Sequence, residues 1–243
     1  MLTVTPDPAS GTTIVRAKVA GAATLRVFRE HELSNGMECL RACDPWTQDT
    51  IAGIRDFECP NDIDVVYTLR GYDKSGKQIG TDEQVVIVLP GEKDWFRPIT
   101  RPLDGVRLLV ESFTTTTAPA QFTTFDVLGR GDRIAVTGAR SMITGDMSLI
   151  TLREAEAAAM RRVFVTGEPV CFLTPVSHGV NRMYLEIGDV NEQRISGTAT
   201  DWARRWTFNV QQIAYPSGVT YQTSFTTWAS VKRDFRTWRD VML

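Results

Sequence analysis

The chain has 243 residues, of which 42% are hydrophobic and 23% charged, the composition of a globular protein long enough to build a sizeable core. Its formal net charge of −2 and pI of about 5.8 argue against the nucleic-acid-binding class, whose surfaces carry an excess of Lys and Arg. No stretch approaches the roughly 18 apolar residues of a membrane-spanning helix, and the first residues lack a signal-peptide pattern, so we expect synthesis in a cytoplasm and no membrane partner.

The first ninety residues read as short strands separated by turns. Side chains alternate with period two at residues 13–19 and 24–29, which predicts strands there. Residues 65–72 read as another strand, and a turn at residues 73–77 leads from it into a strand at residues 84–89. Turn signals recur about every ten residues, so we expect a small antiparallel sandwich. Residues 30–50 are less regular and read as a long loop or insertion. Pro90, Pro98 and Pro102 then mark a joint near residues 90–103, because proline cannot donate to a strand ladder.

The second half reads as mostly β with one helix, an α+β pattern. Strands are predicted at residues 106–113, 122–128, 133–137, 146–150, 170–173, 183–187 and 205–211. The threonine-rich segment around residues 112–124 contains Pro119, which disfavours a central strand. We expect this segment to form a projecting hairpin that contacts a neighbouring subunit.

One helix is predicted over residues 152–163. Thr151 and Glu154 have the spacing of a capping box at its start, and Gly167 follows its end. The side chains expected on its buried stripe are Leu152, Ala155, Ala159 and Val163.

No motif for catalysis or cofactor binding stands out. His31 and His178 are isolated, and the sequence contains no nucleophile elbow, zinc-protease motif or phosphate-binding loop. We therefore expect no enzyme activity, no catalytic residue and no cofactor. Cys39, Cys43 and Cys59, with His31 nearby, leave a zinc site as an alternative. Their spacing lacks a second paired ligand motif, so ordinary thiols, some of them buried, are favoured.

Two short phrases raise the question of binding. Residues 130–132 spell Arg-Gly-Asp, the tripeptide that integrins read, but Gly and Asp are also ordinary turn residues, which is the interpretation we favour. Trp202 and Trp206 bracket two arginines, a composition found at interfaces and where Arg stacks on an aromatic ring. Trp206 alternates within a predicted strand and is expected in the core. Trp202 is equally compatible with a sheet edge and an interface.

The chain closes on two copies of a tryptophan-bearing phrase, at residues 227–231 and 237–241. Tryptophan is enriched at interfaces, and the closing seventeen residues carry four Lys or Arg against two Asp. If the segment is helical, the two copies face about 80° apart. A strap laid across a neighbouring subunit is the favoured interpretation, and a tail that folds back on its own domain is the alternative.

The order of phrases in the second half resembles minor tail proteins of long-tailed phages that infect actinobacteria, the distal tail protein class. The phrases lie at residues 125–130, 133–138, 144–149, 185–190 and 203–208, followed by the terminal repeat. Residues 56–60 and 65–68 resemble the fibronectin- or immunoglobulin-like module that precedes this domain in such proteins. The resemblance covers most of the chain apart from residues 30–50, and it rests on the order of the phrases.

The resemblance implies a mainly β virion protein with an α+β second domain. Residues 1–97 would form an immunoglobulin- or fibronectin-like sandwich, residues 98–216 a tail-tube-like ring domain, and residues 217–243 the C-terminal extension. Such proteins form a homo-oligomeric ring, here expected to be a hexamer, that joins the tail tube protein to the tail-tip hub and other minor tail proteins. The sandwich comes first here, whereas in better-known members the ring domain comes first.

The expected role is therefore structural, in the virion at the tail tip of a siphophage, with no nucleic-acid binding beyond a possible lumen. The residues expected to contact partners are Trp228, Trp238, Trp202, Phe113, Phe122, Phe125, Arg233 and Arg236. A host-surface or carbohydrate-binding module is the rival reading; it predicts clustered aromatics in loops of the first domain, where Trp46 and Trp95 are the candidates. A wall-degrading hydrolase is a third reading and lacks a visible nucleophile or metal set.

Overall fold

The chain is mainly β, as the sequence predicts, with one α-helix among the described residues. The computed structural model describes residues 1–34, 36–43, 45–91, 94–118, 120, 122–126, 133–137, 142–175, 182–196, 202–214 and 216. Internal contacts divide them into a first unit, Met1–Arg107 with Cys171–Met183, and a second unit, Leu108–Val170 with Tyr184–Tyr215. The domain limits read from the sequence, 1–97, 98–216 and 217–243, stay a prediction.

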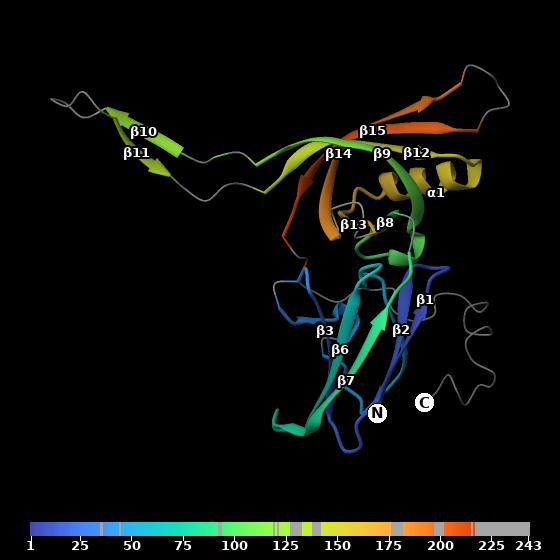
Figure 1. The fold of residues 1–243 in the computed structure, drawn as a ribbon, viewed down its shortest axis with the longest axis vertical. Helices are drawn as coiled ribbons and strands as arrows, with labels where there is room; N and C mark the ends of the chain where they lie inside the picture. Colours follow the sequence, from blue (N-terminus) through green and yellow to red (C-terminus); the bar gives the residue numbers. More distant parts are fainter. Residues whose placement is uncertain are drawn as a thin grey trace. The chain divides into compact units, whose positions relative to one another are not determined.

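The first unit is built on two antiparallel sheets that face each other (Figure 1). Its strands are β1 (Leu2–Asp7), β2 (Thr12–Lys18), β3 (Thr24–His31), β4 (Glu38–Cys39), β5 (Thr50–Asp56), β6 (Asp64–Tyr72), β7 (Gln78–Val88) and β8 (Asp94–Pro98). One sheet has the order β1-β2-β5 and the other β4-β3-β6-β7. In immunoglobulin lettering these orders are A-B-E and C′-C-F-G, the arrangement of an immunoglobulin-like sandwich.

The sandwich core follows from the alternation along the strands. Val15, Leu25, Val27 and Leu69 point between the sheets and are at most 1% exposed, while most of their neighbours in sequence are more exposed. Burying each such side chain contributes about 1.5–3 kcal/mol, which is the main source of stability for a sandwich of short strands. The same inward face carries two polar side chains, Arg29 and Tyr67, which are fully buried.

The segment read from the sequence as a loop, residues 30–50, is more regular than expected. Strand β3 continues to His31, and the short β4 pairs with it before a 3-10 turn, Arg41–Cys43, leads toward β5. The predicted joint near residues 90–103 likewise contains strand β8 and a 3-10 turn, Pro102–Asp104. Strands β1, β5 and β8 were not predicted, because each is short or lacks clean alternation.

The second unit is a curved antiparallel sheet with a helix beneath it (Figure 1). The elements after β8 are β9 (Val106–Thr117), β10 (Phe122–Asp126), β11 (Arg133–Thr137), β12 (Thr144–Thr151), α1 (Glu154–Val165), β13 (Val170–Leu173), β14 (Arg182–Arg194) and β15 (Arg204–Gln212). Six strands follow the order of a closed barrel, β12-β15-β14-β13-β8-β9. Of these, β8 and nearly all of β13 fall within the residues of the first unit.

Helix α1 begins two residues later than the sequence predicts. The Glu156 carboxylate accepts the backbone N–H groups of Leu152 and Arg153 at 2.8 and 3.1 Å, so Glu156 and not Glu154 closes the N-terminal turn. The predicted buried stripe is wrong apart from Val163: the buried side chains are Ala157, Met160 and Val163. No described helix combines the length and the apolar character that crossing a bilayer requires.

Candidate functional site

The described strands between residues 109 and 150 form two antiparallel ladders, together called the hairpin. Strands β9 and β12 pair from Leu109 with Ile150 to Thr117 with Thr144, and β10 and β11 continue the hairpin as a separate sheet. That second sheet has only two strands, so within the described residues neither of its outer edges is paired with a third strand. A two-stranded ladder is marginally stable by itself in water, and unpaired strand edges are templates for pairing with another chain.

The three phenylalanines predicted to contact partners lie along this hairpin. Phe113 is half-buried in β9 opposite Met147, and Phe125 is 54% exposed in β10 opposite Ile134. The backbone of Phe122 lies opposite Thr137, and its side chain falls outside the described part. Of the two whose side chains are described, Phe113 lies on the β9–β12 ladder and Phe125 on the β10–β11 ladder, and no ring contact joins them.

The two tryptophans near β15 have different environments. Trp206 is 2% exposed and its indole N–H donates to Thr151 Oγ1 at 3.0 Å, while its ring packs 5.5 Å from that of Phe164. This burial confirms the prediction, made from the alternation along the strand, that Trp206 lies in the core. Trp202 is 53% exposed, just before β15.

The remaining sequence-based candidates lie outside the described residues. They are Trp228, Trp238, Arg233, Arg236 and the Arg-Gly-Asp phrase at residues 130–132. His178 lies outside them too. Their roles stay predictions from sequence.

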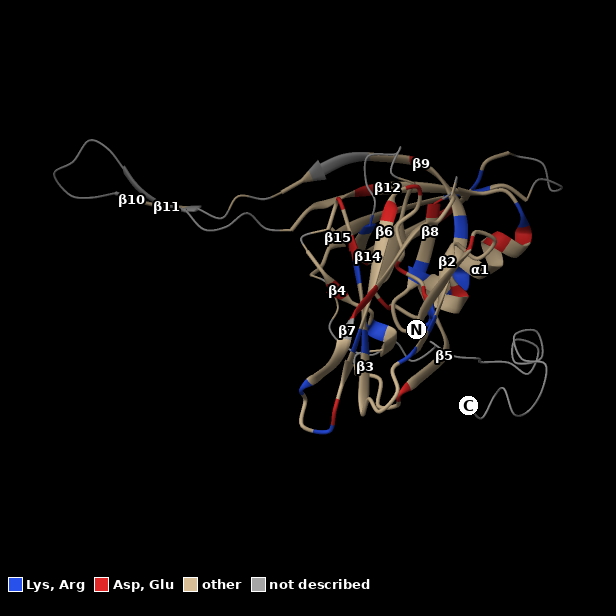
Figure 2. Ribbon diagram, turned by 60° about the horizontal axis from the view of Figure 1, so that its bottom comes forward, with Lys and Arg blue, Asp and Glu red and all other residues tan. Residues whose placement is uncertain are grey.

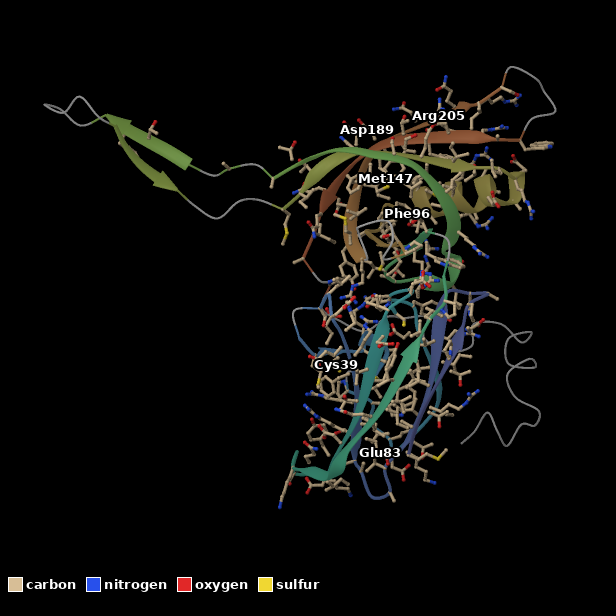
Figure 3. The ribbon with its side chains drawn as sticks, in the orientation of Figure 1. Cys39, Glu83, Phe96, Met147, Asp189 and Arg205 are labelled. Carbon is tan, nitrogen blue, oxygen red and sulfur yellow. The ribbon has the colours of Figure 1, made fainter. Side chains whose placement is uncertain are left out.

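The outer face of the second unit's sheet carries a pocket of about 420 Å³, lined by polar side chains together with Met147 and Phe208. Its polar side chains are Ser112, Asp146, Ser148, Asp189, Asn191, Thr207 and Asn209. Register shifts interrupt β12 next to Asp146 and β14 next to Asp189, and such bulges re-aim side chains. Figure 3 shows Asp189 and Arg205 on the outer side of this sheet and Met147 on the inner side.

Beside this pocket, a charged group spans three strands of the same sheet. Glu111 of β9 accepts from the Ser148 hydroxyl at 2.6 Å and from Arg205 Nε and Nη2 at 2.7 and 2.6 Å. The hydrogen bonds of Arg205 and Ser148 lower the pKa of Glu111 below its usual range. The group is solvent-exposed, so it fixes side-chain positions more than it adds stability.

In the first unit, six charged residues form a buried ion cluster: Arg29, Glu38, Arg41, Asp56, Glu58 and Arg182. Arg29 Nη1 lies 2.7 and 2.6 Å from the two carboxylate oxygens of Asp56. Burial alone would raise the pKa of Asp56, but the charge and hydrogen bonds of Arg29, with the Glu58 N–H and the Tyr67 hydroxyl, outweigh it and lower the pKa. Figure 2 shows that basic and acidic residues are interspersed over the strands, as such pairing requires.

The ion cluster connects distant parts of the sequence. Arg182 Nη2 lies 2.6 Å from each carboxylate oxygen of Glu38, which is 144 residues earlier in the chain. Arg41 pairs with Glu58, and Arg29 reaches Glu38 at 3.1 Å and Glu58 at 3.7 Å. These are structural contacts within the first unit, and sequence reasoning missed them, because no local pattern announces ion pairs between residues this far apart.

A second arginine, Arg97, is buried without a carboxylate partner shown in contact with its guanidinium. It donates to the backbone carbonyls of Phe57, Ser10 and Gly11 at 2.5, 2.5 and 3.0 Å, and its guanidinium lies 4.3 Å from the ring centre of Trp95. Burial lowers the pKa of Arg97 to about 10. Trp95 is therefore engaged in the first unit's own packing.

The thiols and His31 do not assemble a metal site within the described residues. Cys39 is half-buried, and Cys43, Cys59 and Cys171 are buried with free thiols. Burial raises the pKa of Cys59 and of Cys171 to about 12, so both stay protonated at neutral pH. His31 is 8% exposed, and burial, together with the charges of Arg182 and Arg29, lowers its pKa to about 4.

The outer face of β3, β6 and β7 carries a further hollow, of about 620 Å³, which the sequence did not indicate. Four carboxylates line it together with valines: Glu30, Glu32, Asp62, Asp64, Val66 and Val88. The run Glu-His-Glu at residues 30–32 and the alternation Asp-Ile-Asp at residues 62–64 were the available signals. These two runs indicate one acidic hollow only when β3 is known to pair with β6, and that pairing was not predicted from the sequence.

Comparison with known proteins adds no name to these surfaces. No protein-family model matches the chain, and no curated protein matches it.

Proposed function

We propose that this chain is a distal tail protein, a structural subunit that forms a closed homo-oligomeric ring between the tail tube and the tail-tip hub of a long-tailed phage. The observation that carries the proposal is the hairpin of residues 109–150, whose outer ladder has two strands and two unpaired edges among the described residues. A neighbouring copy that adds a strand to either edge satisfies these backbone groups and repeats around a ring.

The side chains of the hairpin support the same assignment. Phe125 presents an aromatic ring that is 54% exposed on a ladder with no third strand among the described residues. An exposed aromatic on a marginally stable ladder is unfavourable for an isolated chain and becomes favourable when another chain covers it. Thr123 and Thr124 are exposed on the same strand and suit extended pairing.

The hairpin proposal is tested by comparing Phe125→Ser with Leu152→Ser. Leu152 lies in the same unit, just before α1, and is 61% exposed, so it is a matched exposed apolar residue away from the outer ladder. Light scattering after size exclusion, and negative-stain images of the protein alone and with its tail partners, measure assembly. Phe125→Ser should reduce ring formation at least tenfold with an unchanged melting temperature, because an interface aromatic contributes about 1.4 kcal/mol or more.

Three results would overturn the proposal. The wild-type chain could remain a monomer with and without tail partners, Phe125→Ser could assemble normally, or Leu152→Ser could impair assembly equally. The last result would mean that general surface hydrophobicity, and not the hairpin, drives association.

A second candidate function is recognition of a host-surface carbohydrate, which the pocket on the second unit's sheet favours. Its carboxylate, amide and hydroxyl groups are those that bind sugar hydroxyls. The aromatics expected in first-domain loops do not support this reading: Trp46 donates its indole N–H to the Thr50 carbonyl at 2.9 Å, and Trp95 stacks on Arg97. Binding of the protein to a host cell-wall glycan, abolished by Asp146→Ala, would favour this candidate over the ring.

A further inference from the structure

The outer face of β3, β6 and β7 is an unpartnered sheet face that combines valine and carboxylate side chains. Glu30 lies opposite Val66 across the β3–β6 pair, and Val66 lies opposite Val86 across the β6–β7 pair. In the next row Asp64 lies opposite Val88. Val86 and Val88 are 60% and 44% exposed on β7, which is the last strand in the order of its sheet.

The carboxylates around the hollow have no basic partner within the described residues. Glu30, Glu32 and Asp64 form no ion pair there, and the fourth carboxylate, Asp62, accepts only the Gly91 N–H at 3.0 Å. No Lys or Arg lines the hollow of about 620 Å³ that these carboxylates surround. Four carboxylates in one hollow repel one another, so a cationic occupant gains both attraction and relief of that repulsion.

The chemistry of the occupant follows from what the face offers. Carboxylates at the rim suit ammonium and guanidinium groups, while Val66, Val86 and Val88 suit aliphatic stems or an indole ring. Within the described residues no group of side chains is placed to hold a metal ion. A peptide that carries both basic and aromatic side chains therefore fits this face better than a bare cation.

The closing segment of this chain has that composition. It carries Lys232, Arg233, Arg236 and Arg239, interleaved with two tryptophans, against two aspartates. We propose that the face of β3, β6 and β7 in the first unit is the docking site for residues 227–239 of a second copy of the chain. The inference rests on the proposed homo-oligomer, since docking in this form needs a second copy of the chain within reach.

Zero-length carbodiimide coupling tests the docking directly, because it joins an amine only to a carboxylate in contact with it. Full-length chains labelled with ¹⁴N and ¹⁵N are mixed, reassembled, coupled and digested for mass spectrometry. Lys232 should couple to Glu30, Glu32, Asp62 or Asp64 in peptide pairs of which one member is light and the other heavy.

Variants give a second readout. Glu32→Gln with Asp64→Asn should weaken association of the copies roughly tenfold, as should Lys232→Gln with Arg233→Gln, and the losses should shrink at high salt. The matched control is Asp82→Asn with Glu83→Gln, which makes the same charge change on β7, in solvent-exposed ion pairs. The control should associate like the wild type.

Each outcome has a distinct meaning. Coupling confined to peptide pairs of a single isotope means that the segment folds back on its own chain and overturns the docking in a second copy. An oligomer without any coupling of Lys232 to these carboxylates overturns the docking site but leaves the proposed ring intact. A chain that stays monomeric at its highest attainable concentration, alone and with tail partners, overturns both. An equal loss in the control double variant also overturns the site, because it assigns the effect to net charge.

Discussion

Replacing Arg29 with Met tests whether one guanidinium holds the buried ion cluster of the first unit. The unbranched Met side chain can follow the path of the aliphatic part of Arg29, so the change removes the charge with little loss of volume. The Arg29 side chain is 0% exposed and that of Asp56 is 4% exposed, with Nη1 2.6 Å from the nearer oxygen. Removing one partner of such a pair costs about 3–5 kcal/mol of unfolding free energy, because it leaves an uncompensated buried charge.

The loss should depend on pH in a direction that a simple packing defect would not show. In the wild type the pKa of Asp56 is lowered, so its stabilisation is present above the ordinary carboxyl range and is lost as pH falls through the folded-state pKa. In Arg29→Met, burial dominates and the pKa of Asp56 rises above its unfolded value. The folded variant then takes up a proton more readily than the unfolded chain. The difference in unfolding free energy between the variant and the wild type should therefore become smaller as the pH falls from 7 to 5.

The assay is urea unfolding at pH 7 and pH 5, followed by hydrogen exchange and mass spectrometry of peptides from β3 and β6, which isolates the first unit. The control is Arg70→Met, which breaks an exposed pair with Asp82 at 2.9 Å and should cost less than about 1 kcal/mol. The reasoning is refuted if Arg29→Met loses no more than this control at pH 7. It is equally refuted if the loss is the same at both pH values.

Three further predictions concern stability. Trp206→Phe removes the indole hydrogen bond and should lower the unfolding free energy of the second unit by about 1–3 kcal/mol in urea; a loss below 0.5 kcal/mol, on the order of a surface change, would contradict it. His31 has a pKa of about 4 when folded against 6.5 as its ordinary value, so the unfolded chain takes up the proton first and stability should fall by about 3 kcal/mol as pH drops from 6.5 to 4. In a His31→Gln variant the melting temperature should fall less between pH 6.5 and pH 4 than it does in the wild type. The same dependence on pH in both proteins would contradict this prediction. Gly11→Ala should lower the melting temperature far more than Gly76→Ala. Both glycines have positive φ, but a Cβ at Gly11 would clash with the Trp95 indole, whereas Gly76 faces open space; equal melting temperatures would refute this.

The sequence predicts well those elements whose side chains alternate cleanly. Strands β6 and β15 lie within one or two residues of their expected positions, because one face of each is buried and the other is wet. Strand β8 escaped prediction because four of its five residues are buried and prolines surround it, which resembles a linker. The helix was found, but its buried stripe was misplaced because Leu152 lies before its start and is exposed.

The candidate sites were predictable only in part. Exposed Phe125 follows from a threonine-rich, aromatic hairpin segment, and burial of Trp206 follows from alternation. The ion cluster and the acidic sheet face depend on which strands pair and in what register, as with Arg29 opposite Tyr67. A single sequence does not encode that pairing in any local pattern, so these charges read only as scattered polar residues.

The first unit is discontinuous in sequence, which affects its folding during translation. Its residues end at Arg107 and resume at Cys171, and the segment that returns supplies Phe172, packed 6.2 Å from Phe96, as well as the Arg182 that neutralises Glu38. Translation proceeds at roughly 5–20 residues per second, so this segment is synthesised several seconds after the strands of the sandwich. During that interval Glu38 lacks Arg182 and Phe96 lacks Phe172, so the first unit completes its packing only after this segment has emerged.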